Sequence, residues 1–286
     1  MATFHKYIKL IHIHPILMIF IIISIITGTF TQLFMLLTIV FVHEIGHLLA
    51  ALYFKWRIHS IVLWVFGGVM KTDESGNRTI REDIIVTVAG PLQHLFIYLM
   101  IIFLSVFHIL PQALIQQALF YNTMILLFNL LPIYPLDGGK LLFYILSYIL
   151  PFRKAHHYTI LFSITVCICV IILQLFVLSF TLSAFLLIIF LLMENRTEWK
   201  NQYYFFIRFL LNRFSDPPSE FSKEQLIVPG QFKLMDVFSL FKRNRTYNII
   251  VDEQHNQKYL TEQQSLYLYF KEKKLAETIG EIVQNL

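Results

Sequence analysis

Charged residues are scarce in this chain, and its longest stretches have none. Lys, Arg, Asp and Glu make up 14% of the 286 residues while 57% are hydrophobic, and residues 10 to 43 include no charged side chain other than histidine. The mean hydropathy of +0.64 is too high for a soluble enzyme of this size. The sequence therefore predicts a multispanning membrane protein.

Cysteine is also rare. The two cysteines, Cys167 and Cys169, lie two positions apart in an apolar run. This spacing indicates neither a disulfide framework nor a cysteine zinc cluster, so we expect ordinary packing roles for both. The net charge of +5 comes from Lys and Arg beside the apolar runs, and it does not indicate direct nucleic-acid binding.

Windows without charge that are long enough to cross a bilayer predict six transmembrane helices. They cover about residues 8–27, 33–54, 84–107, 115–149 with an interruption, 157–177 and 180–194. The first run has no small-residue cleavage site, so we expect a retained helix and not a signal peptide. Basic residues flank alternate loops, which predicts that both termini are cytoplasmic.

The segment between the second and third predicted helices has the pattern of β structure. A β-like run extends from His59 to Met70 and contains Phe66, Gly67 and Gly68, and residues 75–77 (Ser-Gly-Asn) indicate a turn. Two interpretations stay open. The segment is either a plain cytoplasmic loop or a membrane-associated hairpin that offers a strand edge to an extended substrate.

The second predicted helix carries His43-Glu44-Ile45-Gly46-His47. On a helix, the two histidines project from one face about one turn apart, close enough to share one Zn²⁺, and Glu44 lies beside them. A carboxylate within apolar sequence is costly unless it is paired, bound to a metal or placed in a wet cavity. The pattern therefore predicts a zinc metalloprotease site.

The fourth predicted helix is interrupted by residues that cannot continue it. The interruption comprises Asn129, Pro132, Pro135, Asp137, Gly138 and Gly139. Broken backbone at membrane depth is tolerated only where it lines a cavity inside the protein. A catalytic zinc needs three protein ligands, and Asp137 is the natural third beside the two histidines. The alternative is that Asp137 only caps the helix that begins at Gly138.

Two features of the third predicted helix bear on its packing. Ala89-Gly90-Pro91 would permit close helix packing, and His94 is expected to be a hydrogen-bonded structural histidine.

The composition changes to mixed charge from about Glu194, and residues 216–219 (Asp-Pro-Pro-Ser) indicate a linker. We predict a transmembrane domain at 1–194, a linker at 195–224 and a small cytosolic α/β domain at 225–286. In that domain we expect an amphipathic stretch at 234–241, a strand at 247–251 and helices at 263–270 and 279–283.

The two motifs together resemble those of the site-2 protease family of intramembrane metalloproteases. The resemblance carries over to the residues that match, namely His43, Glu44, His47, Asn129, Pro132, Pro135 and Asp137-Gly138-Gly139. It implies an all-α polytopic membrane protein with six spans and a membrane-associated β-hairpin, joined to a small cytosolic α/β domain that resembles a cystathionine-β-synthase (CBS) domain.

The resemblance extends to a sporulation branch of this family. It implies that the substrate is a membrane-associated pro-sigma factor and that the protein lies in the mother-cell membrane around the forespore. It also implies that membrane-embedded inhibitory or scaffolding proteins bind it. The CBS-like domain would bind ATP and could join copies of the chain into a homo-oligomer.

The mechanism we expect is peptide hydrolysis by water at a zinc ion held by His43, His47 and Asp137, with Glu44 as the general base. Substrate-positioning roles are expected for Asn129, Pro135, Phe66, Gly67 and Gly68. An ion transporter or channel regulated by its cytosolic domain is the alternative, although no internal repeat is visible. A membrane-bound protease that cleaves soluble peptides is disfavoured by the depth of His43.

Overall fold

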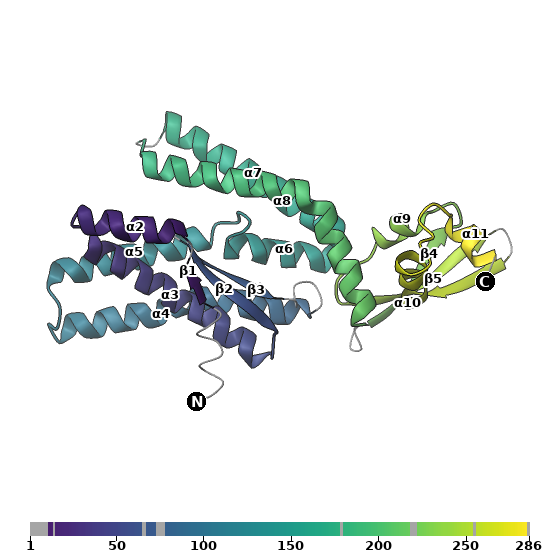
Figure 1. Ribbon diagram of the computed structural model, residues 1–286, viewed down its shortest axis with the longest axis horizontal. Helices are drawn as coiled ribbons and strands as arrows, with labels where there is room; N and C mark the ends of the chain where they lie inside the picture. The colour runs from purple at the N-terminus through teal and green to yellow at the C-terminus, as the bar shows by residue number, and fades with distance from the viewer. Residues whose placement is uncertain are drawn as a thin grey trace. The chain divides into compact units, whose positions relative to one another are not determined.

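The structure is a computed structural model that describes residues 11–13, 15–64, 67–72, 78–177, 180–217, 222–253 and 256–284 (Figure 1). The chain divides into two compact units. The described residues of the first unit fall within Met1–Ser75, Arg81–Leu131 and Leu136–Gly138. The described residues of the second unit fall within Gly76–Ile80, Pro132–Pro135 and Gly139–Leu286.

In the described residues, four helices and a small sheet make up most of the first unit. The helices are α2 (Pro15–Ile26), α3 (Phe30–Tyr53), α4 (Ile80–Val106) and α5 (Gln112–Asn129), and the strands are β1 (Ile11–Ile13), β2 (Ile58–Trp64) and β3 (Gly67–Thr72). Strand β1 pairs parallel to β2, and β2 pairs antiparallel to β3. Helix α3 contacts α2, α5 and β3, so the helix with the histidine motif is central to this unit.

The first predicted helix begins later than expected. It was expected from about residue 8, but α2 starts at Pro15 and residues 11–13 form strand β1. Proline has no N–H and disfavours helical backbone in the residue before it, which makes it a good first helical residue and a poor interior one. Apolar residues lie on both sides of Pro15, so hydropathy alone did not show that the helix begins there.

The expected β segment contains a hairpin. The run from His59 to Met70 holds residues of two antiparallel strands, whose described pairs end with Trp64 opposite Gly67. Gly67 and Gly68 open β3, opposite Trp64 and Leu63. Phe66 and the turn expected at 75–77 lie outside the described residues.

Three helices among the described residues are long and apolar enough to cross a membrane, namely Phe30–Tyr53, Ile80–Val106 and Phe152–Phe176. Large apolar side chains such as Leu95, Phe96, Leu99 and Phe103 project outward from α4, as expected for contact with lipid. Helix α2 has 12 residues, about 18 Å, which is shorter than a hydrocarbon core of about 30 Å. The count of six spans stays a prediction.

The second unit begins with three helices. They are α6 (Asp137–Ile149), which enters this unit at Gly139, then α7 (Phe152–Phe176) and α8 (Leu182–Ser215). Helices α7 and α8 run side by side as an antiparallel pair (Figure 1).

The last membrane helix was expected to end near Glu194, but α8 continues to Ser215. Most of the segment at 195–224 that was expected to be a linker is therefore helical. The mixed charge of this segment concealed an amphipathic face. Phe206, Phe209, Leu210 and Arg213 are buried at helical spacing, and the three apolar residues join a core with the C-terminal segment. The domain boundaries at 194 and 224 stay predictions.

The C-terminal segment is an α/β layer, as expected. Its elements are β4 (Ser222–Pro229), α9 (Leu234–Phe238), β5 (Arg245–Glu253), β6 (Asn256–Thr261), α10 (Glu262–Phe270) and α11 (Ile279–Gln284). Strand β5 is central, parallel to β4 and antiparallel to β6. The polar strands β4 and β6 were not anticipated, because few of their residues are apolar. The resemblance to a CBS domain stays a prediction.

A buried ion pair joins the end of α8 to this layer. Arg213 Nε donates to Glu262 Oε1 at 2.6 Å, and Arg213 Nη1 donates to the carbonyl of Lys242 at 3.0 Å. Glu262 Oε2 also accepts from the backbone N–H of Tyr247 at 3.0 Å. The pair thereby links α8, β5 and α10 inside one unit.

Candidate metal centre

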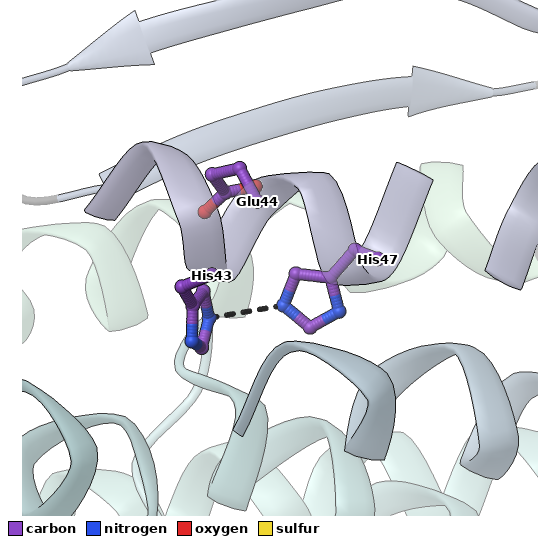
Figure 2. Close-up of side chains that lie close together, drawn as sticks. All are labelled: His43, Glu44 and His47. Carbon is purple, nitrogen blue, oxygen red and sulfur yellow. Dashed lines mark hydrogen bonds between the residues drawn. The ribbon is translucent and has the colours of Figure 1, made fainter. Parts of the chain in front are cut away.

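Helix α3 presents His43 and His47 on one face, as the spacing predicted. Their rings lie nearly perpendicular to each other with the two Nε2 atoms 3.0 Å apart, and Figure 2 shows this approach as a dashed line. Only 3% of His43 and 8% of His47 is exposed. Two adjacent ring nitrogens in such a buried place are well suited to share one metal ion.

Asp137 completes a triangle of donor atoms. Its Oδ2 atom lies 3.1 Å from Nε2 of His43 and 3.1 Å from Nε2 of His47, and the residue is 3% exposed. In a tetrahedral zinc site with bonds of about 2.0–2.1 Å, ligand atoms lie about 3.3 Å apart. The spacing and the chemistry of these three donors therefore fit a zinc ion.

Glu44 lies beside this triangle. One ligand atom from each of His43, Glu44 and His47 falls within 4.8 Å of the others, which is a looser grouping than the contacts of Asp137. The Glu44 side chain is half-buried and leaves α3 next to His43 (Figure 2). This arrangement places a carboxylate near the triangle without making it part of the closest donor set.

The far side of each imidazole is held by a hydrogen bond. The Nδ1 atom of His47 lies 2.8 Å from the carbonyl oxygen of Val86, and a carbonyl can only accept, so this nitrogen carries the proton. The Nδ1 atom of His43 lies 3.1 Å from Nε2 of His94. His94 is hydrogen-bonded, as expected. In neutral His47, the Nε2 atom that faces Asp137 is left with its lone pair.

Gly90 on α4 leaves room for these rings. A Cβ atom at this position would overlap Nε2 of His47 and lie 2.9 Å from Cε1 of His43. The expected close packing at residues 89–91 is thus a close approach to the histidine pair, and even a methyl group would displace the rings.

The break in the fourth predicted helix is present. Helix α5 ends at Asn129 and α6 begins at Asp137. Asn129 donates its amide to the carbonyl of Ile125 in its own helix at 3.0 Å, and Pro135 follows Tyr134 through a cis peptide bond. The substrate roles of Asn129 and Pro135 stay predictions.

Residues from α7 and α8 bond to the part of the break that belongs to the second unit, Pro132–Pro135. The backbone N–H of Tyr134 donates to Oγ of Ser163 at 2.9 Å, and Asn195 Nδ2 donates to the carbonyl of Tyr134 at 2.5 Å. Both side chains are fully buried. The N–H and the carbonyl of Tyr134 thereby receive partners that the interrupted helix does not supply.

Sequence reasoning missed three polar residues around the motifs, namely Asn122, Ser163 and Asn195. All three are fully buried. Asn122 and Ser163 lie in apolar helical runs, so the rule that drew attention to Glu44 would have drawn attention to them, because buried polar side chains in such helices need partners. Asn195 stands between Glu194 and Arg196, and nothing in the sequence around it indicates that it is buried.

The chain is similar in sequence to known peptidases. The model of Peptidase family M50 matches residues 31–110 and 105–172. Stage IV sporulation protein FB of Bacillus subtilis is 38% identical over 276 residues, 96% of each chain. A putative zinc metalloprotease of Synechocystis is 36% identical over 120 residues, 41% of this chain and 31% of that protein.

The chain is also similar to a solved structure. The site-2 protease of Methanocaldococcus jannaschii aligns with a TM-score of 0.51 and 25% identity, over 66% of this chain and 89% of that one. These likenesses set aside the transporter interpretation. The family of zinc metalloproteases also implies zinc, which the donor triangle fits. The chain therefore belongs to peptidase family M50, the site-2 protease family, and it is an intramembrane metalloprotease.

Proposed function

We propose that this chain hydrolyses a peptide bond in a membrane-associated pro-protein at a zinc ion held by His43, His47 and Asp137. The observation that carries the proposal is the buried triangle of donor atoms, with sides of 3.0 to 3.1 Å. When bound there, zinc would lower the pKa of a water molecule and polarise the scissile carbonyl.

The protein residues supply the proton transfers and the ligand geometry. Glu44 accepts a proton from the attacking water and passes it to the nitrogen of the leaving amine. The bond from His47 Nδ1 to Val86 keeps the imidazole in the tautomer that offers Nε2 to the metal. Burial of the triangle limits bulk water, which strengthens the interaction between the ligands and a cation.

The substrate must be extended at the bond to be cleaved, because a helix covers its own backbone. Strand β3 stands at the edge of the described sheet and contacts α3. We propose that the substrate pairs with this edge, near Phe66, Gly67 and Gly68, and that Asn129 and Pro135 help to position it. The contact between β3 and α3 supports a location close to the histidine motif.

The substrate class proposed is an inactive pro-sigma factor that is processed during sporulation. The likeness to stage IV sporulation protein FB along 96% of both chains supports this choice. By the same resemblance, the protein would lie in the mother-cell membrane around the forespore, with six spans and both termini in the cytoplasm. ATP binding and homo-oligomer formation by the C-terminal segment, and inhibition by membrane proteins, stay predictions.

Coexpression tests this function directly. The wild-type chain is produced in bacterial membranes together with a sporulation pro-sigma factor, and the substrate is followed on a gel. We expect a shortened product with the wild type and none with Glu44→Gln. A pro-sigma factor that keeps the bond to be cleaved, but in which polar residues replace the apolar residues of the pro-sequence, is the matched control and should stay intact. Equal cleavage of both substrates would instead support a protease that acts on soluble peptides.

A further inference from the structure

A second imidazole and an amide lie behind His43, outside the donor triangle. His94 is on α4, Asn122 is on α5, and both are fully buried although their helices are apolar. The Nδ1 atom of His94 lies 2.7 Å from Oδ1 of Asn122. Together with the 3.1 Å contact from His43 Nδ1 to His94 Nε2, these bonds form an unbroken chain from Asn122 to His43.

The direction of this chain follows from the Asn122 amide. Its Nδ2 atom donates to the backbone carbonyl of His94 at 3.3 Å, so its Oδ1 atom must be the one that faces the His94 ring. An amide oxygen only accepts, and therefore His94 Nδ1 carries a proton. In neutral His94, the Nε2 atom is then an acceptor, and His43 Nδ1 must donate to it. His43 Nε2 is left with its lone pair toward Asp137.

We propose that His94 and Asn122 are positioning residues, which fix the tautomer and the ring orientation of His43 for metal binding. This inference rests on the proposed role of His43 as a ligand. Metal-binding histidines commonly donate their second nitrogen to such a partner, and loss of the partner costs about 10–100-fold in metal affinity or activity.

The two histidines of the motif are held in different ways. His47 is oriented by a backbone carbonyl, that of Val86, which no substitution removes. Among the residues that the structure describes, the Nδ1 atom of His43 is paired with a side chain, that of His94. Substitutions at His94 or Asn122 should therefore loosen one ligand and leave the other in place, so that the zinc affinity falls without the complete loss expected when a ligand is removed.

Zinc affinity measured by competition with a chelator tests the proposal without relying on cleavage. We expect that purified His94→Leu loses zinc at a chelator concentration about 10–100-fold lower than the wild type. His94→Gln should recover most of the affinity, because its amide offers both an acceptor and a donor. Asn122→Leu should resemble His94→Leu, and the double variant should be no weaker than either single one, since both act through one chain of bonds.

His157→Leu is the matched control. His157 also bonds to an amide oxygen, Oε1 of Gln202 at 3.1 Å, but it lies on α7 in the second unit, whereas both ligand histidines belong to the first. Its variant should bind zinc as the wild type does. Wild-type affinity in folded His94→Leu, or an equal loss in His157→Leu, would overturn the positioning role. If His94→Leu does not fold, the zinc affinity of folded Asn122→Leu tests the positioning role in its place: a reduced affinity supports the role, and the wild-type affinity overturns it.

His43→Ala separates this inference from the proposed function. If His43→Ala binds zinc as tightly as the wild type, the ligand set is wrong and the positioning role falls with it. If His43→Ala loses zinc while His94→Leu keeps it, only the positioning role is overturned.

Discussion

The Oδ2 atom of Asp137 lies 3.1 Å from the Nε2 atom of His47, although ninety positions separate the two residues. A carboxylate oxygen and the lone pairs of two imidazoles repel one another unless a cation or a proton lies between them. A divalent ion bound between these three atoms would therefore stabilise the buried triangle.

Asp137→Asn is expected to weaken both zinc binding and cleavage. The amide keeps an oxygen at the ligand position but removes the negative charge that attracts the ion. The loss of affinity should exceed the roughly 10–100-fold that is typical of outer-shell partners. Zinc content after dialysis and cleavage of the substrate measure the effect. Asp252→Asn makes the same change on the exposed end of β5 and should alter neither quantity.

Glu44→Gln is expected to retain zinc while cleavage falls by about 10²–10⁴-fold, the usual contribution of a general base. The change removes the group that accepts the proton but leaves His43, His47 and Asp137 intact. Zinc content and the rate of cleavage, measured on the same preparation, separate binding from catalysis. A fully active Glu44→Gln protein would refute the assignment of the base.

Gly90→Ala is expected to abolish zinc binding in a protein that still folds into its membrane helices. The added Cβ would overlap His47 Nε2, so the rings must move or the helices must separate. Gly28→Ala adds the same methyl group where nothing lies within 4 Å, at a φ of +71°, and should cost only some backbone strain. Zinc content and circular dichroism of both variants provide the comparison, and normal zinc binding by Gly90→Ala would contradict the packing argument.

Asn195→Leu is expected to lower both the thermal stability and the cleavage rate. It removes the donor to the carbonyl of Tyr134 in the break that leads to Asp137. An unsatisfied buried carbonyl costs about 1–3 kcal/mol. Thr197→Val on the same helix removes an exposed hydroxyl that bonds only within α8 and should change the stability by less than about 0.5 kcal/mol. Thermal unfolding in detergent tests the pair.

Arg213→Met is expected to destabilise the C-terminal layer by about 3–5 kcal/mol, because it leaves Glu262 buried without its partner. Arg245→Met removes a partly exposed ion pair with Glu224 and should cost no more than about 1 kcal/mol. Release of the layer can be followed by limited proteolysis in urea.

The Arg213→Met protein should also become less stable as the pH rises. Burial raises the pKa of the Glu262 carboxyl, and the Arg213 guanidinium opposes that shift in the wild type. Without the guanidinium, the folded pKa lies further above the unfolded one. A carboxyl whose pKa is higher in the folded than in the unfolded protein contributes fully to the free energy of unfolding below its unfolded pKa. That contribution is lost as the pH rises through the folded pKa. A lower urea midpoint at pH 8 than at pH 5 is therefore expected.

The sequence by itself determined the features that depend on near neighbours along the chain. The four-residue spacing of His43 and His47 places both on one helix face, and the prolines between Asn129 and Asp137 must break a helix. Scarce charge similarly predicted membrane helices. Composition failed where an amphipathic pattern was mixed with charge, as in residues 195–215, or where Pro15 set a boundary inside an apolar run.

Only the tertiary structure decided which distant residues meet. It placed Asp137 against the histidine pair, Gly90 beneath the two rings, and His94 with Asn122 behind His43. Local periodicity tells which face of a helix a residue occupies but not which other helix packs against that face. That choice depends on how side chains of several helices fit together, and no single segment of the chain contains this information.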